Sequence, residues 1–433
     1  MSTPLSRMLL AAKRSEIAEL RRLAARAQLV GVAGHLVHAL QNERGASMIY
    51  LASAGARFGT VRTQLLDDSL QMERRMRAAL DAGLREPEPG SARQLSRMAW
   101  VLVGLDALPA LREQIGALTI RAEEAITAYS RLMAGLIALV FEVADAALEP
   151  SVSRRLVALL NLVQGKELAG QERALGALSF AAGRCDGAHQ GRLAHLIEAQ
   201  DRCFQTFVEF ADAPARAEWA RLQDSRAGAR LERLRRTLSQ AAPEAALDPN
   251  LSDMWFDACS ERLADMWQLQ TRLVADLQAR CRERIEEAER ELQDTEGLVH
   301  GLLQHPPEGT WAVDRFFEAG NGQAAVPAAA EVGPQLGRSI IGLLQAQSDR
   351  LAQMEGELDA ARRSLHERKV VERAKGLLMA RLQVSEEAAY RLLRQTAMAQ
   401  GKRLVEIAEA TLALPGFIAT PLPQEEGLGG PGR

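Results

Sequence analysis

Two otherwise apolar segments of this 433-residue sequence each contain a glutamate followed directly by an arginine. Glu43-Arg44 lies in LQNERGASMIYLASAG, and Glu172-Arg173 lies 129 positions further on, in KELAGQERALGALSFAAGR. Neighbouring residues on a helix point in different directions, so neither glutamate can neutralise the arginine beside it on the same face. Both arginines therefore need partners from other elements, and the small residues around them would let another helix approach closely.

A third cation, Arg262, stands among core-like residues in MWFDACSERL. Arginine suits a small planar oxyanion, because its fork of N–H donors matches two oxygens in one plane and it stays charged when buried. The alternative is that each arginine pairs with an internal carboxylate or extends to solvent along its aliphatic stem. The stretch RLERLRRTLSQ adds Arg233, Arg235 and Arg236, for which a solvated helix face is the favoured interpretation.

The elements that must position these arginines are predicted to be helices. Leu, Ala, Arg, Glu and Gln dominate, aromatic residues make up only 4% of the chain, and strand patterns bounded by turns are hard to find. Helical periodicity extends from about residue 4 to 304, with breaks expected at 86–90, Pro109, Pro150 and 243–249. Long helices with short connections pack antiparallel, which predicts one or two four-helix bundles on a common axis.

The remaining sequence divides into three further parts and a tail. Residues 305–337 are rich in Gly, Pro and Ala and are predicted to be a linker. Residues 338–366 show a heptad spacing of apolar residues, which predicts a coiled-coil helix that joins two chains or, alternatively, packs on its own chain. Residues 367–413 are predicted to form three short helices, and 414–433 a disordered tail.

Charge and composition restrict the class of protein. Residues 361–413 carry eleven Lys or Arg against six Asp or Glu in a chain of net charge -3, which favours a module that binds a polyanion, with a solvated helix face as the alternative. The four cysteines are far apart and the seven histidines form no metal-ligand pattern. The N-terminal apolar run is too short for a signal peptide, and the apolar run over 132–141 is half of a membrane span. A cytoplasmic, metal-free protein without a membrane anchor is expected, and no enzyme motif is visible.

The large N-terminal region, taken as residues 1–304, resembles the nitrate- and nitrite-sensing (NIT) domain. The resemblance rests on the two Glu-Arg segments and on WFDACSERLADM, and it covers roughly residues 30 to 290. It implies an all-α fold of two coaxial four-helix bundles, with the anion between helices and held by arginines. Carried over to this sequence, the anion ligands are Arg44, Arg262 and Arg173, and no cofactor is implied.

The C-terminal segment ERKVVERAKGLLMARLQVSEEAAYRLLRQTAMAQGKRLVEIAEA resembles the ANTAR domain, an RNA-binding antitermination module. The resemblance implies binding to leader mRNA that carries paired hairpins, and no binding to DNA. Specific RNA recognition reads unpaired loop bases and uses cations on the flanking phosphates. Tyr390 and Met398 could stack against bases, but packing in the core of the domain is the favoured interpretation for each. The residues assigned to RNA binding are Arg373, Lys375, Gly376, Tyr390, Arg394, Ala397 and Met398.

The two resemblances together imply a nitrate- or nitrite-responsive transcription antiterminator, present as a homodimer. Most ANTAR proteins are expected to carry a phosphoacceptor receiver domain, and this chain lacks the alternating β/α pattern of one. Anion binding is therefore expected to release or align the ANTAR domain. The alternative is an ANTAR antiterminator whose helical sensor responds to another small ligand or to a partner protein.

Overall fold

The computed structural model describes residues 3–85, 90–145, 147, 149–241, 246–304, 358–359 and 361–413. Every regular element in these ranges is a helix, which confirms the predicted all-α class. The predicted linker, the predicted tail and most of the predicted coiled-coil helix lie outside the described residues. The chain divides into two compact units, Met1–Ala361 and Arg362–Arg433.

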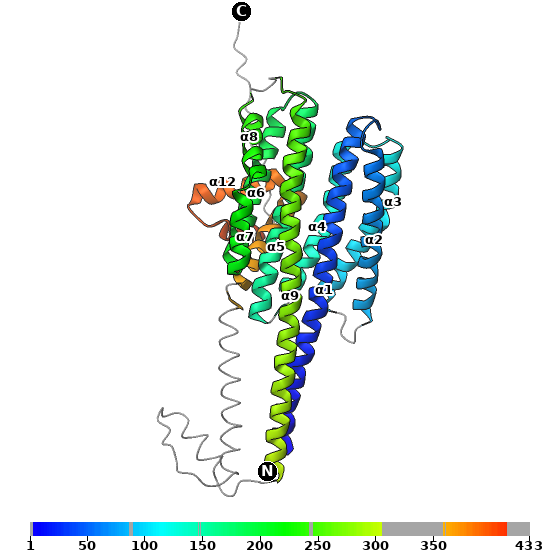
Figure 1. Cartoon of the computed structure of the whole chain (residues 1–433). Helices are drawn as coiled ribbons and strands as arrows, with labels where there is room; N and C mark the ends of the chain where they lie inside the picture. The colour runs from blue at the N-terminus through cyan, green and yellow to red at the C-terminus, as the bar shows by residue number, and fades with distance from the viewer. Residues whose placement is uncertain are drawn as a thin grey trace, which may run out of the picture. The chain divides into compact units, whose positions relative to one another are not determined.

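The first four helices form one four-helix bundle (Figure 1). They are α1 (Thr3–Ala52), α2 (Gly59–Leu84), α3 (Ala92–Gly116) and α4 (Ala122–Asp145). Its core is apolar: Leu40, Met76, Leu105 and Leu136 are completely buried. Each such side chain contributes roughly 1.5–3 kcal/mol by leaving water, so packing rather than helix propensity holds the bundle together.

The next five helices form a second bundle (Figure 1). They are α5 (Pro150–Ala181), α6 (Gly187–Phe210), α7 (Ala213–Gln223), α8 (Arg226–Gln240) and α9 (Leu251–Gln304). α7 and α8 follow one another in the place that α3 occupies in the first bundle. The break between them is stabilised by Ser225, whose Oγ accepts a hydrogen bond from the Gly228 amide and so caps α8.

Two of the prolines behave differently from one another. Pro150 begins α5, where its missing N–H would have had no helical partner in any case. Pro109 was expected to break the helix, and this expectation is wrong, because α3 continues through it. The Pro109 ring is exposed, and the buried residues Leu105, Leu108 and Arg112 continue one packed face on both sides of it.

The two bundles lie side by side with their axes parallel, not end to end on the common axis that was expected (Figure 1). The reason is that α1 of the first bundle and α9 of the second run antiparallel along almost their whole length. Lys13 pairs with Glu291 near one end of this contact, and Arg57 pairs with Asp253 at the other. The interface between the bundles is completed by contacts of α5 with α1 and α4.

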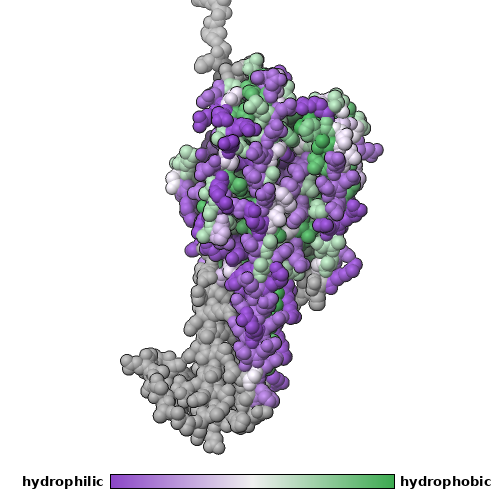
Figure 2. Space-filling view, in the orientation of Figure 1, coloured by the Kyte–Doolittle hydropathy of each residue, from purple (hydrophilic) through white to green (hydrophobic). Residues whose placement is uncertain are grey.

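Beyond the bundles, the first part of α1 and the last part of α9 continue as a two-helix stalk (Figure 1). Ile17 and Leu20 of α1 and Ala288 of α9 form its small apolar core. Its visible surface is mostly hydrophilic (Figure 2), and ion pairs such as Arg14–Glu296 join the two helices there. α9 thus connects the bundle interface with the chain that leads to the second unit.

Two helical segments, Leu10–Ala52 and Ala122–Asp145, are long and apolar enough to cross a membrane by length and composition alone. Of their apolar windows, 56% and 61% are buried inside the protein, which fits core helices of the bundle.

The second unit consists of a helix over 361–382 followed by α12 (Glu386–Gln400) and α13 (Leu404–Ala413). Ser385 caps α12, since its Oγ accepts a hydrogen bond from the Ala388 amide, and Gly401 ends α12 with a positive φ of 60°. Its core has contributions from all three helices: Val370, Ala374, Leu393, Ala397, Val405, Ile407 and Ala408.

Candidate functional site

The glutamates of the two Glu-Arg pairs point into their own bundles. Glu43 accepts two hydrogen bonds from Arg112 of α3, at 2.7 and 2.8 Å, and one from the Tyr129 hydroxyl at 2.8 Å. Glu172 accepts two from Arg235 of α8, at 2.6 and 2.7 Å. The expected solvated face for Arg235 is therefore wrong: this side chain is buried, because it neutralises the completely buried Glu172.

The arginines of the pairs point the other way, into the interface between the bundles. Arg44 donates to both carboxylate oxygens of Glu167 on α5, at 2.6 and 3.3 Å, and to Ser130 Oγ on α4 at 2.9 Å. A Cβ at Gly170 would lie 2.7 Å from Arg44 Nη2, so glycine is needed there for the guanidinium to fit. Arg44 thus has the internal carboxylate that the alternative interpretation required.

Arg173 has no such carboxylate among the described residues. Its Nη1 donates to Ser260 Oγ on α9 at 3.0 Å, and its Nη2 donates to the Gln41 carbonyl on α1 at 3.1 Å. The guanidinium lies over the ring of Phe256, and its buried Nε has no hydrogen-bond acceptor in the described structure. Burial and the charge of Arg44 lower the pKa of Arg173 to about 10, so the side chain stays cationic at neutral pH.

An internal repeat explains why the two arginines differ. The shift of 129 positions that superimposes Arg44 on Arg173 also places His38 in the position of Glu167. The serine contacts repeat as well, since Ser130 accepts from the first arginine and Ser260 from the second. The second arginine thus has a histidine where the first has its carboxylate. Of these two arginines, Arg44 forms an ion pair and Arg173 forms none within the described part of the chain.

His38 belongs to a buried cluster with Trp267 of α9 and Lys166 of α5. The imidazole stacks on the indole with ring centroids 4.1 Å apart, and Lys166 Nζ lies 4.6 Å from the indole centroid. Burial, Lys166 and Arg173 together lower the pKa of His38 to about 2, so the ring is neutral. Lys166 is completely buried, and its Nζ has no hydrogen-bond partner in the described part of the chain.

The interface therefore contains more positive than negative charge. Arg44 and Arg173 approach it with Glu167 as their nearby carboxylate, while His38 is neutral and burial lowers the pKa of Lys166 to about 7. A buried cation without a counter-ion is costly, and a small anion that accepts from Arg173 Nε would offset that cost. Gly45 leaves room for the Arg173 guanidinium itself, since a Cβ there would lie 2.6 Å from Arg173 Nη2.

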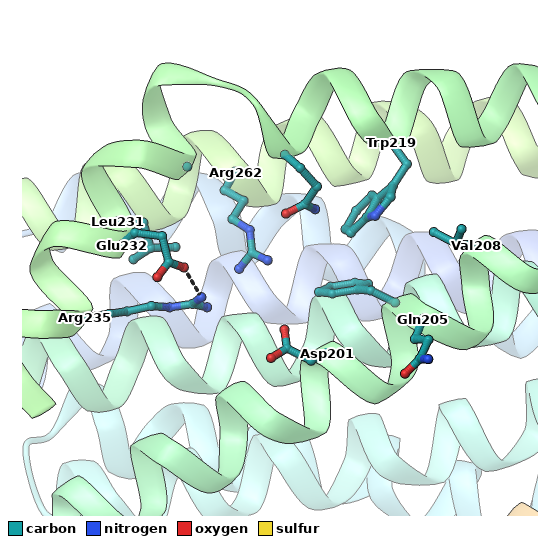
Figure 3. A pocket seen from close by; sticks show the side chains of 11 residues that line it. Asp201, Gln205, Val208, Trp219, Leu231, Glu232, Arg235 and Arg262 are labelled. Carbon is teal, nitrogen blue, oxygen red and sulfur yellow. Dashed lines mark hydrogen bonds and ion pairs between the residues drawn. The ribbon is translucent and has the colours of Figure 1, made fainter.

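Arg262, the third predicted anion ligand, lies in a pocket of the second bundle (Figure 3). This pocket has a volume of about 380 Å³ and is lined by α6, α7, α8 and α9. Arg262 Nη1 donates to Gln200 Oε1 at 3.0 Å and the guanidinium lies over the ring of Phe204. Burial and the charge of Arg235 lower its pKa. The structure thus brings Arg44 and Arg173 together and puts Arg262 beside Arg235.

In the second unit, the predicted RNA-binding residues fall into two groups. Arg373, Arg394, Gly376 and Met398 are exposed, and Met398 is 72% exposed, so the favoured alternative of core packing does not describe it. Tyr390 is half-buried.

Lys375 and Ala397 form the other group, because both are buried. Lys375 Nζ pairs with Glu372 and Glu386, both at 2.8 Å, and Ala397 belongs to the three-helix core. Burial alone would lower the pKa of Lys375, but these two carboxylates hold it above its ordinary value. The geometry gives Lys375 the role of joining two helices, in addition to any contact with RNA.

Sequence reasoning did not single out Glu167, Lys166, His38 or Arg112. The first two are in the segment that carries the second Glu-Arg pair, and extending the internal repeat by two turns would have set His38 against Glu167. Nothing in the sequence pattern distinguishes Arg112 from the exposed arginines. Among the described residues, no group of three or more His, Cys, Asp or Glu could hold a metal ion.

Comparisons with known proteins agree with this architecture. A family model described as nitrate and nitrite sensing matches residues 35–278, and the model of the ANTAR domain matches residues 359–412. The nitrate regulatory protein of Klebsiella oxytoca is 32% identical over 409 residues, which are 93% of each chain. The solved structure of the NasR transcription antiterminator covers 94% of this chain and 98% of its own, with 31% identity and a TM-score of 0.59.

The all-helical fold, the buried arginines and these matches define a regulatory protein with a sensor and an RNA-binding module. The chain belongs to the family in which a nitrate and nitrite sensing domain is joined to an ANTAR domain.

Proposed function

We propose that this protein is a cytoplasmic, homodimeric transcription antiterminator that binds nitrate or nitrite between its two bundles and then binds leader mRNA through its second unit. The observation that carries the proposal is Arg173: a buried guanidinium with a free Nε and no carboxylate partner in the described structure. The relatives, by name a nitrate regulatory protein and a transcription antiterminator, support the same function. The predicted dimer seam over 338–366 lies mostly outside the described residues.

Nitrate fits the donors around Arg173. The ion is planar, and Nε with one Nη of a guanidinium presents two parallel donors to two of its oxygens. Ser260 Oγ, 3.0 Å from Arg173 Nη1, is a further donor within reach. The positive charge of Arg44 favours an anion at this place, although its own donors are taken by Glu167 and Ser130.

Anion binding at this place would act on α9. Arg173 is on α5, but its partners Ser260 and Phe256 are on α9 and Gln41 is on α1. An anion that draws these groups together changes how α1 and α9 pack, and both helices continue into the stalk (Figure 1). α9 ends at Gln304, immediately before the segment that precedes the second unit. A few kcal/mol of differential anion affinity is enough to shift such an equilibrium.

Paired hairpins in leader mRNA are the proposed target of the second unit. Its exposed residues Arg373 and Met398 supply one cation for phosphates and one apolar surface for unpaired bases. Stabilising such hairpins prevents formation of the terminator.

The experiment that tests the proposal measures the affinity of the full-length protein for a paired-hairpin leader RNA, with and without millimolar nitrate. Calorimetric titration with nitrate gives the anion affinity separately. Arg173→Gln is expected to lower both the anion affinity and the RNA response by about tenfold or more, because it removes a charge-assisted contact. Gly45→Ala is expected to act in the same direction by displacing the guanidinium.

Two further variants make the result specific. Arg44→Gln combined with Glu167→Gln removes a whole ion pair without leaving a buried charge, so it tests the contribution of this pair to anion binding with the least risk to folding. Arg262→Leu changes the separate pocket and is expected to keep the nitrate response. Loss of the response in Arg262→Leu, with Arg173→Gln unaffected, would contradict this site and favour the pocket as the anion site. Strong RNA binding that ignores nitrate and nitrite would favour the alternative sensor ligand.

A further inference from the structure

The pocket around Arg262 exists because the second bundle departs from the first. In the first bundle α3 is one continuous helix, whereas in the second its place is taken by α7 and α8 with a break over 224–225. The pocket lies at this break, since Trp219 and Gln223 of α7 and Gly228 and Leu231 of α8 line it. The second bundle therefore has a pocket beside the break between α7 and α8, where the first bundle has the continuous helix α3.

The residue at the base of the pocket also differs between the copies. Ser130 and Ser260 occupy equivalent places, as shown by their contacts with the two arginines. The shift of 130 positions that superimposes these two serines also places Leu132 of α4 in the position of Arg262 of α9. Leu132 is an ordinary core residue that packs over Gly104 of α3. A core leucine in one bundle is thus an arginine in the other, and this arginine lines the open space (Figure 3).

The contacts of Arg262 leave it available for an acidic ligand. Gln200 Oε1 accepts from its Nη1, and no carboxylate pairs with it in the described part of the chain. The neighbouring cation, Arg235, is already committed to Glu172 and Glu232. Of the two arginines that line this pocket, Arg262 is therefore the one that forms no ion pair within the described residues.

The other walls indicate the rest of the ligand. Phe204, Trp219 and Leu231 are buried and give apolar surface beside Arg262. Asp201 and Glu232 are exposed and line the same pocket (Figure 3). Glu232 pairs with Arg235, so Asp201 supplies the acidic charge of the rim. The volume of about 380 Å³ is in the range of pockets for small organic molecules and far exceeds the need of a four-atom anion.

We propose that this pocket binds a second ligand, an α-amino acid with an apolar side chain. Its carboxylate pairs with Arg262, its side chain packs against Phe204 and Trp219, and its ammonium group faces Asp201. Because α7, α8 and α9 all line the pocket, a bound ligand would also act on α9, which carries Ser260 of the proposed anion site. The ligand would thus report the supply of an organic nitrogen compound to the same regulator.

The test is calorimetric titration of the full-length protein with L-leucine and L-phenylalanine. Their amides, which lack the carboxylate, and 3-phenylpropionate, which lacks the ammonium group, are titrated in parallel. Arg262→Leu copies the residue of the first bundle and removes the charge of Arg262 together with its hydrogen-bond donors. Asp201→Asn is the matched change at the rim. Titration of each variant with nitrate, together with its thermal unfolding, checks that the protein is folded.

Binding of the amino acids that is weakened about tenfold or more in Arg262→Leu, and absent for the amides, is the expected result. Asp201→Asn is expected to weaken the amino acids and leave 3-phenylpropionate unchanged. Equal affinity of amino acids and their amides, equal affinity in the Arg262→Leu protein, or no heat with any of these compounds would overturn the proposal. Because nitrate is titrated separately, failure here does not touch the anion site at Arg173.

Discussion

At the scale of single residues, the arginines at equivalent positions of the internal repeat have different partners. Arg44 is neutralised by Glu167, and its equivalent Arg173 faces the neutral His38. Removing one partner of a buried ion pair typically costs 3–5 kcal/mol, because the other charge remains without compensation. Arg173 has no carboxylate partner in the described structure, so its buried charge carries a cost of this kind. An anion that binds beside it would offset that cost.

Lys166 gives a prediction on the pH dependence of stability. Burial lowers its pKa to about 7, whereas a lysine in the unfolded chain titrates near 10.4. Between these values the unfolded state holds a proton that the folded state lacks, so the free energy of unfolding rises with pH across this window. Lys166→Met removes the penalty. The variant is expected to be more stable than the parent by about a few kcal/mol at pH 7, with the difference shrinking toward pH 10.

Chemical denaturation at several pH values measures this difference. Lys402→Met, at an exposed lysine of the second unit, is the control and is expected to leave the pH dependence as it is. A difference between Lys166→Met and the parent that stays constant from pH 7 to pH 10 would show that Lys166 is charged in the folded protein.

Arg373 and Lys375 give a second prediction, because they are close in sequence and differ in environment. Arg373 is exposed, so Arg373→Ala is expected to weaken RNA binding and to reduce the salt slope of binding by about one, without loss of stability. Lys375 pairs with Glu372 and Glu386, so Lys375→Ala is expected to destabilise the second unit by about 1–3 kcal/mol. RNA titrations at several salt concentrations, with thermal unfolding of each variant, separate the two effects. Unchanged stability of Lys375→Ala would contradict the structural role given to this residue.

At the scale of elements, close helix packing depends on glycines at particular positions. A Cβ at Gly176 of α5 would lie 2.2 Å from the ring of Trp255, the fully buried indole of α9. Gly176→Ala is therefore expected to destabilise the first unit by about 1–3 kcal/mol through overpacking. Gly297 of α9 is the matched control, because a Cβ there meets nothing within 4 Å.

Gly297→Ala is expected to leave stability unchanged or to raise it by up to about 1 kcal/mol, as alanine favours a helix interior. Thermal unfolding of both variants measures the contrast. A neutral Gly176→Ala would mean that α5 and α9 can separate at little cost, and a rigid interface between them would then be excluded.

The helices themselves are arranged for transmission along α1 and α9. These two helices line the bundle interface and also form the stalk, so a change in their packing at Arg173 extends to both stalk helices (Figure 1). α2, α3 and α6 to α8 end within the bundles. They hold the site in place, and only α9 carries the chain onward to the second unit.

At the scale of the whole molecule, the division into two units gives a prediction for calorimetry. Each unit has its own apolar core, and the proposed anion site lies entirely in the first. Nitrate is therefore expected to raise the unfolding temperature of the first unit by mass action, about 2.7 kcal/mol at one hundred times its Kd, and to leave that of the second unit unchanged.

Differential scanning calorimetry of the full-length protein, with the fragment over 359–413 to assign its transition, measures both. Chloride at equal ionic strength is the control for general salt effects. An equal nitrate-dependent shift of both transitions would mean that the two units unfold together, and independent modules joined by a linker would then be the wrong description.

The sequence by itself determined the local properties of this protein. Composition and apolar spacing predicted helices throughout, and three helices do occur over 367–413, although the first of them is already helical from residue 361, before the predicted boundary. The Glu-Arg-Gly and Glu-Arg-Ala segments singled out Arg44 and Arg173, because a charge in an apolar helical segment is visible in the sequence alone. The family follows from such local patterns, and so does the choice of these two arginines as candidate anion ligands.

Only the tertiary structure decided which partner each buried charge has. Arg44 and Glu167 are 123 positions apart in the sequence, and Arg112 and Glu43 are 69 apart. Helical periodicity predicts which face of a helix is buried, but it does not predict which residue of another helix that face contacts. For the same reason the side-by-side bundles, the burial of Arg235 and the unbalanced charge of Arg173 could not be predicted. They depend on which helix lies opposite, and that is settled by packing of the whole core.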